Sequence, residues 1–285
     1  MKVIFSFQNN NDIKPQNPKV NFGAGLTPKI MEEIQRADVL EISSRLAKKG
    51  IPTDFKGNKI IAWCCDKTVE IFEQLNKKYK LKLALPKGIY VEDFNKLNIG
   101  NPYALGTCNL LPAKLIKDSD ERVLPRSIFF NSLHIWENID KIADYDYAIG
   151  LSSTPHFLNF GLHEVIHSAH EDRLLDKLGA KTLARELDLY KNRIEITGYR
   201  QKYGEKVSEI CDYAKTDPFE AIACDIPRVI VSVLDKETLI PTKNPFIGTP
   251  YEKLSFLQRA KISDYPDGER PLQEVLRNFW NGRFD

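Results

Sequence analysis

Residues 161–167 read Gly-Leu-His-Glu-Val-Ile-His, which places His163 and His167 four positions apart with Glu164 directly after the first. The apolar residues around this motif recur at helical spacing, and Gly179 is a typical helix stop. Positions four apart lie on one face of a helix, so both imidazoles can reach a single ion. The pattern therefore predicts a long helix that carries a metal site.

Different residues of this motif are suited to metal binding and to catalysis. Two neutral imidazoles hold Zn²⁺, and a carboxylate beside them takes a proton from the water on the metal. His163 and His167 are the predicted zinc ligands, and Glu164 is the predicted general base. The alternative is an ordinary amphipathic helix with histidines at its solvent edge. We favour the metal site because the motif lies on a predicted helix between apolar neighbours.

The third ligand has to come from outside this motif. The metzincin pattern requires Gly three residues after the second His and another His three residues further on, and those positions hold His170 and Arg173. His170 shares the helix face, but helix rise places it about 10 Å along the axis from His163. The remaining class of site takes a Glu from a later helix.

Residues 207–223 read VSEICDYAKTDPFEAIA, which resembles the second motif of the anthrax lethal-factor-like zinc endopeptidases, a pattern close to S-x-YA-x-T-N-P-x-E-x-x-A. The resemblance implies that Glu220 is the third zinc ligand. It also implies that Tyr213 points its hydroxyl at the scissile group, with Tyr199 and Tyr203 as fallback candidates. It covers this motif, the metal-binding helix and the loose order of strands before it, and leaves out the first and last 50 residues.

The chain departs from that family pattern in two places. Asp217 replaces the usual Asn, and Cys224 stands where the family usually has another Glu; Asp225 is one residue later, on a different helix face. A carboxylate at that point often supports a ligand histidine. Glu220 also has a structural alternative, because Asp217-x-x-Glu220 is a capping box. The upstream His-Glu-x-x-His motif and Tyr213 lead us to favour the ligand.

The order of elements predicts an α+β fold of zincin-like type, in which a small mixed sheet precedes a mainly helical part. We expect a strand and linker in residues 1–25 and one catalytic domain in residues 26–285, with an α/β lobe at 26–153 and a helical lobe at 154–285. Residues 127–131 are the candidate edge strand for a peptide substrate. The remaining strands are expected at 3–7, 59–63, 81–85 and 89–91, and the helices at 27–50, 67–78, 154–179, 183–194, 217–227, 251–261 and 271–280.

Composition narrows the class of function. Lys and Arg number 41 against 39 Asp and Glu, a net charge of +2 that does not suit a dedicated nucleic-acid binder. The five cysteines include no CxxC spacing, which favours a reducing compartment. We recognise no signal peptide or membrane-spanning segment, so a cytoplasmic location without membrane association is the default expectation, with non-classical export left open.

These observations predict a zinc-dependent metallopeptidase that holds one Zn²⁺ and hydrolyses peptide bonds, with a peptide or protein as its partner. Two alternatives stay open. One is a degenerate zincin that binds zinc as a structural or interaction protein, and the other is a zinc hydrolase acting on a non-peptide amide. Substrate specificity and oligomeric state are not indicated by the sequence.

Overall fold

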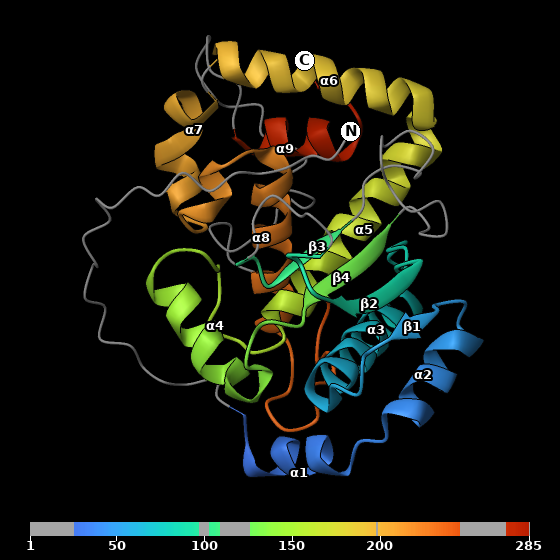
Figure 1. Ribbon diagram of the computed structural model, residues 1–285. Helices are drawn as coiled ribbons and strands as arrows, with labels where there is room; N and C mark the ends of the chain where they lie inside the picture. The colour runs from blue at the N-terminus through green and yellow to red at the C-terminus, as the bar shows by residue number, and fades with distance from the viewer. Residues whose placement is uncertain (1–25, 97–102, 109–125, 198, 246–271, 285) are drawn as a thin grey trace.

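The computed structural model describes residues 26–96, 103–108, 126–197, 199–245 and 272–284 of the chain (Figure 1). It is a mixed α+β structure in which helices predominate. The helices are α1 (Pro28–Arg36), α2 (Val39–Lys48), α3 (Lys59–Tyr79), α4 (Ile139–Ala148), α5 (Asn159–Leu178), α6 (Ala180–Thr197), α7 (Tyr199–Ser208), α8 (Pro218–Val231) and α9 (Leu272–Trp280), with 3₁₀ turns η2 (Trp136–Asn138) and η3 (Tyr213–Lys215).

The strands form one small mixed sheet. Its order is β1 (Thr53–Asp54), β2 (Gly88–Glu92), β4 (Ser127–Asn131) and β3 (Gly106–Cys108). The first two pairings are parallel, and β3 runs antiparallel to β4. The predicted strands at 89–91 and 127–131 are therefore confirmed. The second of these was wrongly expected at an edge, because β4 is paired on both sides and the edge belongs to β3.

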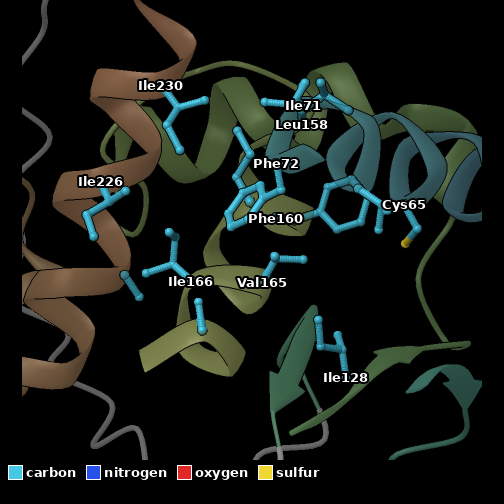
Figure 2. Packing of buried hydrophobic residues seen from close by; sticks show 14 of the residues in the cluster. Cys65, Ile71, Phe72, Ile128, Leu158, Phe160, Val165, Ile166, Ile226 and Ile230 are labelled. Carbon is cyan, nitrogen blue, oxygen red and sulfur yellow. The ribbon is translucent and has the colours of Figure 1, made fainter. Parts of the chain in front are cut away.

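The metal-motif helix α5 lies in the middle of the hydrophobic core. Figure 2 shows Val165 and Ile166 of α5 between Phe72 of α3 and Ile226 of α8, with Ile128 of β4 close by. Phe160, in the first turn of α5, packs edge-on against Phe130 of β4, with ring centroids 5.1 Å apart. Contact with the sheet, α3 and α8 together fixes α5 from several sides.

The expected single helix over residues 27–50 is in fact two helices. Ala37 leaves the helical conformation, and Asp38 then accepts hydrogen bonds from the amides of Leu40 and Glu41 at the start of α2. A side chain that caps a new helix competes with continuation of the old one. The expected start of the first helix is confirmed, since Thr27 caps α1 through the amide of Ile30.

The strand expected at residues 59–63 is wrong, because these residues form the first turns of α3. The amide of Ile61 donates to the Asn58 side chain, which caps the helix. The local apolar run suggested a strand, but burial of Ile61, Cys65, Val69 and Phe72 follows helical spacing over the longer stretch.

The strand expected at residues 81–85 does not form either. The side chain of Asn76 bonds both the amide and the carbonyl of Leu83, at 3.0 and 2.7 Å. These backbone groups are therefore occupied by a side chain of α3 instead of a neighbouring strand.

Two further helix boundaries differ from expectation. The chain makes a turn after Thr154, in which His156 accepts the amide of Leu158, and α5 begins only at Asn159. The sequence predicts that Pro227 kinks or ends the helix that Asp217 opens; the helix does not end there, because α8 continues to Val231 with its apolar face buried. The stop at Gly179 is confirmed, and the helices expected at 183–194 and 271–280 correspond to α6 and α9.

Two expected elements, the strand at 3–7 and the helix at 251–261, lie outside the described residues. The helices α4 and α7 and the strands β1 and β3 were not predicted. Among the described residues, no helix combines the length and the apolar character needed to cross a membrane.

Replacing Asn58 by Ala should lower the free energy of unfolding by about 1 kcal/mol, because the amide of Ile61 loses its capping partner. Urea unfolding of wild type and variant measures the difference. Asn58→Asp keeps a capping oxygen and should retain most of the stability. Equal losses in the two variants would show that the cap is not what Asn58 contributes.

Candidate metal centre

Helix α5 presents His163 and His167 on one face, one turn apart. Both side chains are mostly buried, with 13% and 14% of their surfaces exposed. Their rings meet edge to face, with centroids 4.7 Å apart. Because the helix is packed on several sides, the two imidazoles are held in place before any ion binds.

The first turn of α8 brings Glu220 to the same place. Asp217 caps this helix, accepting the amides of Phe219 and Glu220 at 2.7 and 3.0 Å. The carboxylate of Glu220 lies against His163 and His167. The expected cap is therefore present, but Asp217 supplies it while Glu220 is turned to the histidines.

The three side chains form a nearly regular triangle of donor atoms. The Nε2 atoms of His163 and His167 are 3.0 Å apart, and they lie 3.1 and 3.3 Å from Oε2 of Glu220. Zinc bonds of about 2.0–2.1 Å at the tetrahedral angle place donor atoms about 3.3 Å apart. Two imidazoles and a carboxylate are also a donor set that zinc accepts, so these residues could hold that ion.

Without a bound ion, the carboxylate of Glu220 interacts electrostatically with the imidazoles of the two histidines. Burial by itself lowers the pKa of His167, but the Glu220 carboxylate outweighs it and raises that pKa to about 9. Burial raises the pKa of Glu220, and attraction to His167 and hydrogen bonds with both imidazoles outweigh it, so this pKa is well below its ordinary value. The metal-free site therefore pairs an ionised Glu220 with a protonated His167.

Glu164 faces this cluster from the same helix. It is 7% exposed, and its Oε2 has no hydrogen-bond partner among the described residues. Burial raises its pKa, while electrostatic interactions with the neighbouring histidines oppose that rise. A buried carboxylate oxygen without a hydrogen-bond partner is rare in proteins and often marks a place where a water molecule or an ion binds.

Strand β3 packs directly against Glu164. A Cβ atom added to Gly106 would lie 3.0 Å from both Cγ and Oε1 of Glu164, closer than side chains normally approach. The absence of a side chain at residue 106 therefore lets the strand and the carboxylate sit side by side. Gly106 was not predicted as a site residue, because a three-residue strand has too little pattern to be recognised.

Tyr213 lies on the other side of His163, in the 3₁₀ turn η3. Its ring centroid is 6.1 Å from that of His163, and its amide donates to the carbonyl of Gly150 at 2.8 Å. Burial and then the negative charge of Glu220 raise the pKa of its hydroxyl well above the ordinary value. The tyrosine is therefore a neutral hydrogen-bond donor. The side chains of Tyr199 and Tyr203 lie outside the described part of the chain.

The other histidines lie away from the triangle. His170 is buried, donates to the carbonyl of Phe279 at 3.0 Å and stacks on Trp280, and burial lowers its pKa to about 3. His156 stacks on Phe157, and His134 contacts backbone carbonyls near residue 103.

A second buried carboxylate on α5 was not anticipated. Glu171 follows His167 by four residues and is 2% exposed. Burial raises its pKa well above the ordinary value, and His167, a hydrogen bond with Cys108 of β3 and Arg126 oppose that rise. Its spacing of four residues from His167 places it on the same helix face, which is a signal that the sequence does contain.

Comparisons with protein-family models, with curated proteins and with solved structures find no match for this chain. The chemistry of the site is therefore inferred from its residues and their geometry.

Zinc affinity should rise with pH up to about 9, because His167 is protonated below that pKa in the metal-free protein. A zinc ligand must be neutral, so binding displaces this proton, and the dissociation constant should fall roughly tenfold per pH unit until His167 is deprotonated. Chelator competition over a pH series measures the affinity, and calorimetry in buffers of different ionisation enthalpy measures the proton release.

Glu220→Gln provides the matched control for this pH dependence. It removes the carboxylate that raises the pKa of His167, so NMR titration of the metal-free variant should show this imidazole losing its proton at a lower pH than in wild type. A wild-type affinity that is flat over the same pH range would contradict a protonated His167.

Proposed function

We propose that this chain is a zinc-dependent peptidase of zincin-like fold, resembling the lethal-factor-like endopeptidases. The observation that carries the proposal is the triangle of His163, His167 and Glu220 with the unpartnered oxygen of Glu164 beside it. Helix α5 supplies two ligands and a base, and α8 supplies a carboxylate from a later helix, as that class of zinc site requires.

The residues have distinct roles in the proposed reaction. When bound, zinc lowers the pKa of a water molecule and polarises the scissile carbonyl. Glu164 accepts a proton from the water and passes it to the leaving amine. Tyr213 donates its hydroxyl hydrogen to the developing oxyanion, a role often worth about 3 kcal/mol in the transition state.

The free edge of β3 supports a peptide as the substrate. The carbonyl of Leu105 accepts the amide of Asn131 at 2.9 Å, so residues 105 and 107 bond to β4 and the backbone groups of Gly106 and Cys108 point the other way. Among the described residues, no strand pairs with that side. A peptide added there would run past Glu164, so β3 replaces residues 127–131 as the proposed substrate strand.

Purified wild-type protein should contain about one zinc ion per chain, and His163→Ala and Glu220→Ala should both lose it, because three protein ligands are needed. Elemental analysis after dialysis against trace zinc measures the content. His170→Ala is the matched control, since this imidazole bonds α9 and should not affect zinc stoichiometry. Zinc retained in Glu220→Ala would show that Glu220 is not a zinc ligand.

Glu164→Gln should keep its zinc and lose about 10²- to 10⁴-fold in peptide hydrolysis, because the amide cannot accept the proton of the water. Cleavage of casein and of a peptide library, followed by mass spectrometry, measures the activity. Full activity in a zinc-loaded Glu164→Gln sample would refute the mechanism. A wild-type protein that binds zinc but cleaves neither peptides nor other amides would instead support a zinc-binding interaction protein. The presence of Cys224 in place of a carboxylate residue is the sequence feature that favours this alternative.

A further inference from the structure

The second ring nitrogen of His163 has an unusual neighbour. Nε2 faces Glu220 and His167, and Nδ1 lies 3.9 Å from Sγ of Cys224. A histidine that binds a metal through one nitrogen carries its proton on the other, and almost always donates it to an oxygen acceptor. Here the group in that direction is a thiol.

Helix α8 explains how the sulfur reaches this position. Cys224 follows Glu220 by four residues, so both side chains project from the same face toward α5. The helix is fixed locally, because the hydroxyl of Ser153 donates to the carbonyl of Cys224 at 2.6 Å. The proposed ligand and its neighbour therefore approach His163 on one rigid element.

The nearest carboxylate in the sequence is engaged elsewhere. Asp225 accepts two hydrogen bonds from Arg228, at 2.8 and 2.6 Å, and so points along its own helix. Cys224 itself is 1% exposed. A thiol sulfur thus stands where a charged oxygen would otherwise support the histidine.

We propose that Cys224 is a positioning residue for His163, with its sulfur accepting the Nδ1–H of the ligand imidazole. This inference rests on the proposed zinc site and adds a specific property to it. A thiol sulfur is a weaker acceptor than a carboxylate, so it fixes the tautomer and the orientation of the ring while adding little to its basicity. The site should consequently hold zinc less tightly than one with a carboxylate at this position.

The test compares zinc affinities in variants of residue 224, measured by chelator competition on the full chain. Cys224→Ala removes the acceptor and should weaken zinc binding by about 10-fold. Cys224→Asp has nearly the same volume and adds a charged acceptor, so it should bind zinc at least about 10-fold more tightly than Cys224→Ala. NMR of the zinc-bound protein should show a slowly exchanging Nδ1 proton on His163 in wild type and in Cys224→Asp, and a faster one in Cys224→Ala.

Cys64→Ala is the matched control, because it removes a buried thiol from a helix that does not touch the triangle. Thermal unfolding of the metal-free variants separates loss of affinity from loss of fold. Wild-type affinity in Cys224→Ala, or equal losses in Cys224→Ala and Cys224→Asp, would overturn the inference while leaving the zinc site intact. Absence of zinc from wild type would instead refute the proposed function.

Discussion

Several carboxylates are buried around α5, and the elements packed against this helix must accommodate them. An ionised carboxylate is costly to bury unless it has partners, and Glu164, Glu171 and Glu220 are all less than one-tenth exposed. Glu220 is paired with the two histidines of α5, Glu171 interacts with His167, with Cys108 of β3 and with Arg126 at the entry to β4, and burial raises the pKa of Glu164 and of Glu171. Arg126 adopts a left-handed backbone conformation, which costs about 1 kcal/mol outside glycine, and its carbonyl accepts the hydroxyl of Ser168. Separation of α8 from α5 would therefore leave the buried Glu220 carboxylate without its partners.

The start of α8 shows how two polar roles can be divided between neighbours. In sequence, Asp217 and Glu220 fit both a capping box and half of a metal site, and the two interpretations compete for the same Glu. In the structure one oxygen of Asp217 accepts both amides of the first turn. The Glu220 side chain is then not needed at the helix end. Because Asp217 caps the helix without help from Glu220, the buried Glu220 carboxylate is available to the histidines.

The sequence predicted the features that depend on local pattern. The helix bearing the histidines, its end at Gly179 and the strands β2 and β4 follow from spacing and stop signals. The start of α3 was read as a strand because its short apolar run has no period of its own, and the cap at Asn58 decided the outcome. Gly106 could not be found, since its importance depends on a strand pairing that only the folded chain creates. The meeting of Glu220 with the histidines was expected through the family resemblance alone, because 57 residues separate it from His163.

The hydrogen bond between His170 and the carbonyl of Phe279 joins positions 109 apart in the chain. During synthesis, α5 leaves the ribosome long before α9 is made. Until then, the His170 side chain has neither its hydrogen-bond acceptor nor the ring of Trp280 that stacks on it. Contacts between such distant positions form late and slow folding. A nascent chain that has not yet reached α9 therefore leaves this side of α5 open, and its exposure to chaperones and proteases lasts until α9 docks.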